Sequence, residues 1–148
     1  MSARLLAIIA ASLVAGPAAA QAGGQPAGPP ASAPGATVAV VNRTDRTITG
    51  QPFAVPDGPL EVVISVAEIP AGGALPMHKH PWPRVAFVES GQLRVHYEEA
   101  GLVRVFGPGE AVVEAIDQWH EGEVVGDAPV RLIVVDQVPP GRSNVVSR

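Results

Sequence analysis

The segment HKHPWPR, residues 78–84, contains the side chains of this chain that are best suited to chemistry. His78 and His80 are two residues apart, so in an extended strand both side chains point to one face, with Cα atoms about 6.5–7 Å apart. Neutral imidazoles so arranged can bind one ion, and imidazole suits Zn, Cu, Fe and Ni. The pair alone is a weak signal, because exposed histidines occur at this spacing by chance.

A third ligand must come from another segment, and the chain has two other histidines. His120 stands at the start of a predicted strand, next to Trp119, and is the better candidate. His96 alternates with Val95 and Tyr97 in a predicted strand, and its phase indicates a solvent-facing side chain. His120 is therefore the candidate that joins the first two histidines.

The composition excludes several other kinds of site. The 148 residues include no cysteine, so disulfides and thiolate ligands are ruled out and an ion must bind N and O atoms. The net charge is -4 and Lys79 is the only lysine, so we expect no nucleic-acid partner. Neither a G-x-S-x-G motif nor a Gly-rich phosphate loop is present, which leaves nucleophilic hydrolysis and nucleotide binding unsupported.

Residues 1–20 have the layout of a secretory signal peptide. Arg4 precedes an apolar run over residues 5–15, and Gly16-Pro17 then leads to small residues before Gln21. The run is shorter than the ~20 residues of a membrane-spanning helix, although an uncleaved N-terminal anchor is the alternative. We expect cleavage after Ala20, a periplasmic or secreted protein, and no stable membrane span once the peptide is removed.

The remaining chain predicts one linker and one all-β domain. Residues 21–36 are Gly, Pro, Ala, Ser and Gln without periodicity, as in a flexible linker. Residues 37–148 form the domain, which ends in a short tail that either folds back or stays loose. Its β-branched or alternating segments are separated by turn signals and predict strands at 37–41, 60–69, 84–89, 92–98, 102–106, 110–115, 120–125 and 130–138.

Two stretches of the predicted domain resemble the motifs of the cupin family. Residues 72–91 resemble the first motif, G-x5-H-x-H-x3,4-E-x6-G, at Gly72, His78, His80 and Gly91. Residues 109–120 resemble the second motif, G-x5-P-x-G-x2-H-x3-N, at Gly109 and His120. The second motif is less complete, since the usual Pro, Gly and Asn are replaced by Ala115, Asp117 and Val124.

The resemblance covers residues 72 to about 135 and implies a double-stranded β-helix, or jelly-roll barrel, with a metal in its mouth. In the family, two histidines and a glutamate of the first motif and the histidine of the second bind the ion. This implies His78, His80 and His120 as metal ligands. The position of the glutamate is occupied by Arg84.

Arg84 conflicts with a metal ion, because a guanidinium is always charged. At about 6 Å from a dication, with an effective dielectric constant of ~20, the repulsion is about 5 kcal/mol. Three arrangements relieve the conflict. Arg84 can pair with an acid, for which Glu114 is attractive, or it can bind the carboxylate or enolate of an anionic substrate. Otherwise the site holds no metal.

Glu114 and the two tryptophans also have alternative roles. Glu114 can replace the missing acidic ligand, act as a general base with a raised pKa, or face the solvent. Trp82 and Trp119 flank the ligands. They either plug the ends of the barrel or form an aromatic wall of a substrate pocket.

Cupins with three histidines and no glutamate include dioxygenases, so the resemblance implies dioxygenase-type oxidation of a small anionic organic substrate. The expected cofactor is a divalent ion of Fe, Mn, Ni, Cu or Zn, with Arg84 and Glu114 as catalytic residues. Isomerase or lyase chemistry on a small hydroxy- or keto-acid comes next. The alternative is a non-catalytic module that binds metal or a small molecule. By analogy, edge strands and the arm at 37–49 suggest a possible homodimer.

Overall fold

The computed structural model describes residues 35–148, and Ala39–Arg148 form one compact unit. The predicted signal peptide and the predicted linker up to residue 34 lie outside the described residues. Nine strands and no helix occur in the described part of the chain. Accordingly, no described segment is a helix of the length and hydropathy needed to cross a bilayer.

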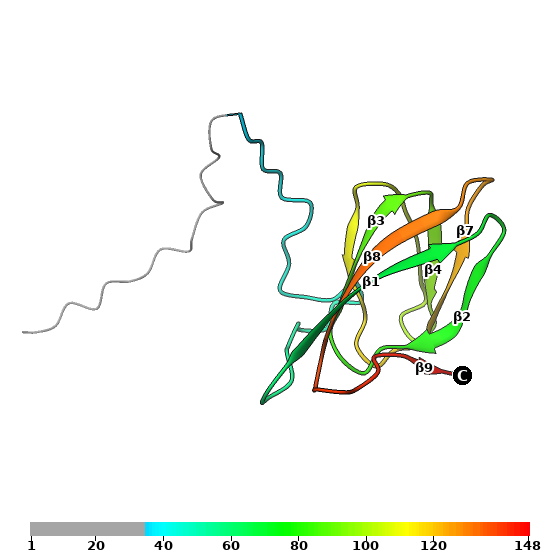
Figure 1. Cartoon of the computed structure of the whole chain (residues 1–148). Coiled ribbons are helices and arrows are strands. Elements are labelled where there is room, and N and C mark those ends of the chain that lie inside the picture. The colour runs from blue at the N-terminus through cyan, green and yellow to red at the C-terminus, as the bar shows by residue number, and fades with distance from the viewer. Residues whose placement is uncertain (1–34) are drawn as a thin grey trace, which may run out of the picture. The chain divides into compact units, whose positions relative to one another are not determined.

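The strands form two antiparallel sheets that face each other (Figure 1). The first sheet has the order β1-β8-β3-β6, with β1 Glu61–Ile69, β8 Val130–Val138, β3 Arg84–Ser90 and β6 Ala111–Val113. The second has the order β5-β4-β7-β2-β9, with β5 Leu102–Phe106, β4 Leu93–Tyr97, β7 His120–Val124, β2 Ala74–Lys79 and β9 Val146–Ser147. The predicted fold class is confirmed, since this is an all-β, cupin-like double-stranded β-helix.

Alternation of buried and exposed positions places the core between the two sheets. In β8 every second residue is buried, beginning with Val130, Leu132 and Val134. In β4 the buried positions are Leu93, Val95 and Tyr97. Since successive side chains of a strand point to opposite faces, these residues fill the interior.

Most strand predictions agree with the structure. The differences lie where pairing with a neighbouring strand determines whether a segment becomes a strand. The strands at 102–106 and 130–138 have the predicted bounds. The prediction of a strand at 37–41 is wrong, because these residues pair with no neighbouring strand. A β-branched composition favours a strand only where a neighbouring strand supplies hydrogen bonds and packing. The β2 strand, which carries His78, is absent from the predicted strands, and it begins directly after the turn that the Gly73 amide closes on the Pro70 carbonyl.

The C-terminal tail folds back along the second sheet. Its β9 strand pairs with β2, with Ser147 opposite His78 and Val146 opposite Lys79. The Arg148 amide also donates to the Met77 carbonyl at 3.2 Å. Figure 1 shows the tail beside β2. Of the two courses left open by the sequence, the structure has the tail that folds back.

Candidate metal centre

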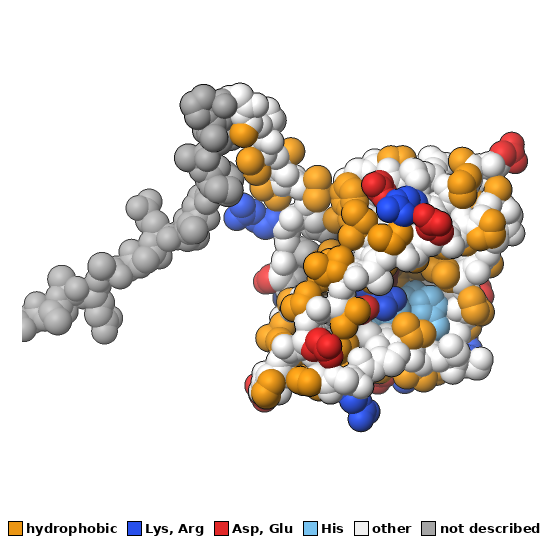
Figure 2. All heavy atoms as spheres, in the orientation of Figure 1, with side chains coloured by type: hydrophobic (Ala, Val, Ile, Leu, Met, Phe, Trp, Pro, Cys, Tyr) orange, Lys and Arg blue, Asp and Glu red, His pale blue; other side chains and the backbone are white. Residues whose placement is uncertain are grey.

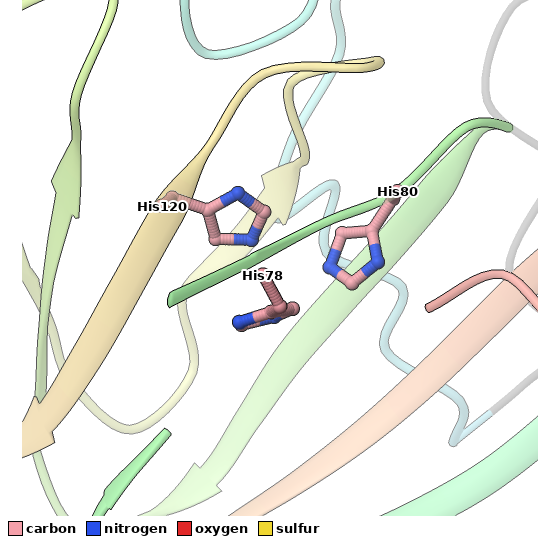
Figure 3. A group of neighbouring side chains, drawn as sticks. All are labelled: His78, His80 and His120. Carbon is pink, nitrogen blue, oxygen red and sulfur yellow. The ribbon is translucent and has the colours of Figure 1, made fainter. Parts of the chain in front are cut away.

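The three predicted histidine ligands meet inside the barrel (Figure 3). His78 on β2 is the cross-strand partner of His120 on β7, and His80 follows directly after β2. The ring centroids of His78 and His120 are 4.4 Å apart, and each lies 4.9 Å from that of His80. One potential ligand atom of each ring lies within 4.8 Å of the others, so a single ion can contact all three after small movements.

Backbone carbonyls orient all three rings through the same nitrogen. The Nδ1 atoms of His78 and His80 lie 2.7 Å from the carbonyl oxygens of Pro76 and Asn144, and that of His120 lies 3.0 Å from the oxygen of Gln118. A carbonyl only accepts, so Nδ1 carries the proton and Nε2 keeps its lone pair. Fixing of the second nitrogen in this way is characteristic of metal-binding histidines.

Burial keeps the three imidazoles neutral, which is the form that binds metal. Desolvation by burial is the largest cause of the lowered pKa of His78 and of His120. Repulsion from His120 lowers the pKa of His78 further, and repulsion from Arg84 lowers that of His120. Burial and then the Arg84 guanidinium lower the pKa of His80 to about 2. The donor set therefore suits a divalent ion of the Zn, Cu, Fe or Ni type.

Arg84 pairs with an acid, but the acid is Asp136 and not the predicted Glu114. Arg84 Nε and Nη2 donate to Asp136 Oδ1 and Oδ2 at 2.7 and 2.8 Å, a bidentate pair. The two residues are direct cross-strand partners on β3 and β8, so their side chains share the interior face. Glu114 instead lies beyond the end of β6, and only its backbone amide bonds to the Arg84 carbonyl.

The pairing leaves one end of the guanidinium free to face the histidines. Arg84 Nη1 lies 3.3 Å from His80 Nε2, the atom that keeps its lone pair for an ion. Nε and Nη2 are held by Asp136, so Nη1 remains for an anion in the cavity. The bidentate fork that we expected for a substrate carboxylate is therefore already occupied.

Glu114 is buried beside the histidines without joining their group. Its carboxyl accepts a 2.8 Å hydrogen bond from the Tyr97 hydroxyl, and the group of converging ligand atoms does not include it. Burial raises the pKa of Glu114, and the same cause raises the pKa of Tyr97. The solvent-facing alternative is wrong, and a role in proton transfer fits better than ligation.

The histidines line a cavity of about 220 Å³. Arg84 and Glu114 also reach it, and the rest of its wall is largely apolar, with Leu75, Leu93, Val95, Leu132 and Val134. This volume lies below the roughly 300–1,000 Å³ that is typical of drug-sized ligands, so it suits a small molecule. Figure 2 shows histidine side chains within a hollow of the face that it draws.

The tryptophans do not line this cavity. The ring of Trp82 lies 5.6 Å from the Arg142 guanidinium, and that of Trp119 lies 5.1 Å from the Lys79 ammonium and 4.7 Å from the Arg148 guanidinium. They therefore pack against cationic side chains of β2 and of the tail. This arrangement does not support the aromatic substrate wall, which needs rings in the cavity.

Two buried polar residues of the site were not predicted from the sequence, namely Asp136 and Asn144, which are 6% and 5% exposed. A signal for Asp136 was available, because it follows Leu132 and Val134 at interior positions of one strand. No comparable signal marks Asn144, whose place depends on the path of the tail. His96 has a side chain that is 43% exposed, as its phase predicted, and lies outside the histidine group.

The departures from the second motif leave the path of the loop before His120 intact. Asp117 adopts a φ of 55°, the left-handed conformation for which glycine is usual at this position. Asp tolerates it better than most residues, and the Asp117 amide donates to the His80 carbonyl at 2.8 Å. The loop therefore connects the two ligand segments despite its changed sequence.

Comparison with known proteins agrees with the architecture. Residues 65–136 match the family model described as Cupin domain. No curated protein matches the chain. Among solved structures, DMSP lyase DddQ from Ruegeria pomeroyi DSS-3 is 26% identical, with a TM-score of 0.52, over 66% of this chain and 46% of that one. The chain thus spans less than half the length of that lyase.

A second solved structure is an uncharacterized conserved protein with a double-stranded beta-helix domain from Klebsiella pneumoniae. It is 21% identical, with a TM-score of 0.50, and the alignment covers 73% of this chain and 84% of that one. At this identity the likeness concerns the fold alone. The matched domain and the observed double-stranded β-helix support the place of this chain in the cupin superfamily.

Proposed function

We propose that this protein binds a divalent metal ion through His78, His80 and His120 and acts as a metal-dependent enzyme on a small organic anion. The observation that carries the proposal is the convergence of three neutral imidazoles whose Nδ1 atoms are all held by backbone carbonyls. The three histidines would hold the ion, which would supply polarisation of a bound oxygen ligand or, with a redox-active metal, oxidation by O2.

The leading reaction is a dioxygenase-type oxidation. The largely apolar wall of the cavity suits a small substrate together with O2. Arg84 Nη1 provides a cationic donor for the anionic end of the substrate, while Asp136 keeps the guanidinium in place. Glu114, whose pKa is raised by burial, lies at the cavity wall and accepts a hydrogen bond from the Tyr97 hydroxyl, a place from which it can exchange a proton with a substrate.

A lyase is the second candidate. It is favoured by the 26% identity to a protein described as a DMSP lyase and by the Glu114–Tyr97 pair, which can take up and return a proton. Incubation of the metal-loaded protein with small organic acids in an oxygen-electrode cell separates the two candidates. Substrate-dependent O2 uptake supports oxidation, whereas product formation under nitrogen supports elimination.

Elemental analysis of untagged protein tests the metal proposal. After incubation with each of Fe, Mn, Ni, Cu and Zn, near-stoichiometric metal is expected, with loss in His78→Ala and His120→Ala. His96→Ala is the matched control, because its exposed side chain lies outside the group. Three converging imidazoles should bind about one equivalent of metal per chain. If every metal binds at less than about a tenth of an equivalent, the non-catalytic module that binds a small molecule becomes the better description.

We further propose a homodimer and an exported location. The edge strand β1 exposes apolar side chains, including Val62 at 59% and Ile64 at 70%, and a second β1 can cover them. Light scattering of wild type and Ile64→Lys tests the dimer, which the lysine should dissociate. The proposed export rests on the signal-peptide pattern of residues 1–20, and cell fractionation with N-terminal sequencing tests it.

A further inference from the structure

Asn144 is a buried polar residue in an otherwise exposed segment of the tail. Its neighbours Ser143 and Val145 are exposed, whereas Asn144 is 5% exposed. Its side-chain Oδ1 accepts from the Trp82 amide at 2.9 Å, and its Nδ2 donates to the Trp82 carbonyl at 3.1 Å and to Asp136 Oδ1 at 2.6 Å. Both polar atoms of the amide are thus satisfied, which fixes the orientation of the side chain.

Through these contacts Asn144 reaches the histidine group by two routes. Its backbone carbonyl holds His80 Nδ1 at 2.7 Å, and so directs Nε2 toward the other rings. Its side chain bonds the same oxygen of Asp136 that accepts from Arg84 Nε. One residue therefore orients a metal ligand and also supports the carboxylate that holds the adjacent cation.

We infer that Asn144 is a positioning residue of the metal centre, which aligns His80 for the ion and keeps Arg84 paired with Asp136. The inference rests on the proposed metal-binding function. It assigns the C-terminal tail a part in the site, in keeping with Val145 and Ser147, which line the same cavity. The hydrogen bonds of the Asn144 side chain fix the position of the Asn144 backbone. They thereby hold the Asn144 carbonyl in place against His80 Nδ1.

The test compares Asn144→Ala and Asn144→Asp with Glu61→Ala. The aspartate keeps an acceptor for the Trp82 amide but has no donor for Asp136 Oδ1 or for the Trp82 carbonyl. The control removes a different anchor of the same tail, the 2.8 Å bond from the Gly141 amide to Glu61, which has no contact with the histidines. Nitrogen-15 NMR of the metal-free proteins reports which imidazole nitrogen of His80 carries the proton. We expect the proton of His80 on Nδ1 in wild type and in Glu61→Ala, and a mixture of the Nδ1-protonated and Nε2-protonated tautomers in Asn144→Ala.

The second measurement is the affinity for Zn²⁺ in competition with a chromophoric chelator. Loss of a residue that orients a ligand commonly lowers metal affinity by roughly 10–100-fold. We expect such a loss in Asn144→Ala, one at least as large in Asn144→Asp, whose carboxylate faces that of Asp136, and no change in Glu61→Ala.

Equal tautomers and equal affinities in all four proteins would overturn the inference. So would equal losses in Asn144→Ala and Glu61→Ala, because the tail would then act only as a cover. A wild-type protein that binds none of Fe, Mn, Ni, Cu and Zn overturns the proposed function instead. In that case the tautomer of His80 still decides whether Asn144 positions the ring.

Discussion

Arg84 and Asp136 form a buried bidentate ion pair at 2.7 and 2.8 Å, directly across the β3–β8 ladder. The pair brings a cation to the metal centre together with its own counterion. The net charge that the pair brings to the histidines is therefore close to zero, which relieves much of the repulsion that an isolated guanidinium would exert on a dication. An arginine can consequently occupy the position of the family's acidic ligand.

Removal of one partner of this pair should destabilise the domain strongly. Asp136→Ala leaves a guanidinium buried and unpaired, and breaking a buried pair in this way typically costs about 3–5 kcal/mol. Arg84→Met combined with Asp136→Leu should recover most of that loss, because apolar groups of similar volume need no partner. Urea unfolding of the single and double variants measures the difference.

The Arg84–Glu114 pair serves as the matched control. No hydrogen bond joins these two side chains, so Arg84→Ala and Glu114→Ala should be closer to additive in unfolding free energy than Arg84→Ala and Asp136→Ala. A larger coupling between Arg84 and Glu114 would contradict the assigned pairing.

The sequence predicted the histidines better than the residues that support them. His78, His80 and His120 stand at motif positions with fixed strand phase, and the structure brings them together. The partner of Arg84 depends instead on the register between β3 and β8, strands that are separated by some forty residues of sequence. Local patterns carry no information about such a register, and so they indicated Glu114 as the partner and gave no sign of a pairing with Asp136.

The tail shows the same limit. β9 has two residues, and its place is fixed by hydrogen bonds to β2 and by the buried amide of Asn144. Neither contact produces a periodic pattern along the tail sequence. Strands such as β5 and β8, whose bounds were predicted correctly, carry regular β-branched or alternating residues between clear turns.

Arg84 should weaken metal binding in the wild-type protein. Its Nη1 lies 3.3 Å from His80 Nε2, so an incoming ion must displace that contact and accept a nearby cation. Arg84→Gln is therefore expected to bind Zn²⁺ at least about tenfold more tightly, which corresponds to roughly 1 kcal/mol, the value of one typical hydrogen bond. Chelator competition measures the affinity. Unchanged or weaker binding in a variant that circular dichroism shows to be folded would contradict this competition.

The metal-free domain should lose stability as the pH falls below about 6.5, the pKa of an unfolded histidine. His80 has a pKa of about 2 in the folded protein, so between these values the unfolded chain binds a proton that the native state does not. This contributes a slope of roughly 1 kcal/mol per pH unit. Chemical unfolding with a chelator present, from pH 7 to pH 5, measures it, and His80→Gln should show a shallower dependence.

Glu114 acts in the opposite direction. Its raised pKa means that the native state holds a proton that the unfolded chain releases, so its contribution falls as the pH rises above about 4.5. The comparison of wild type with His80→Gln cancels this contribution, because both proteins retain Glu114. Equal slopes in the two proteins would show that His80 takes up its proton in the folded protein as readily as in the unfolded chain.

Two motif glycines should differ sharply in their tolerance of alanine. Gly91 and Gly72 both have positive φ, 76° and 70°, where an L-residue costs about 1–2 kcal/mol. A Cβ on Gly91 would lie 2.4 Å from the Pro129 carbonyl oxygen and 2.8 Å from the Val130 Cα, whereas one on Gly72 meets nothing within 4 Å. Thermal and urea unfolding should show a loss of about 1–2 kcal/mol for Gly72→Ala and of roughly 3 kcal/mol or more for Gly91→Ala.

The difference has a structural reason, which is the close approach of two backbones. The segment that contains Gly91 joins β3 to β4, and it passes directly over the start of β8. The obstructing atoms belong largely to the backbone and cannot rotate away, so Gly91→Ala must shift a strand that carries part of the cavity wall. Equal losses for the two alanine variants would mean that the conformational cost alone explains the motif, and that the contact with β8 is looser than the structure has it.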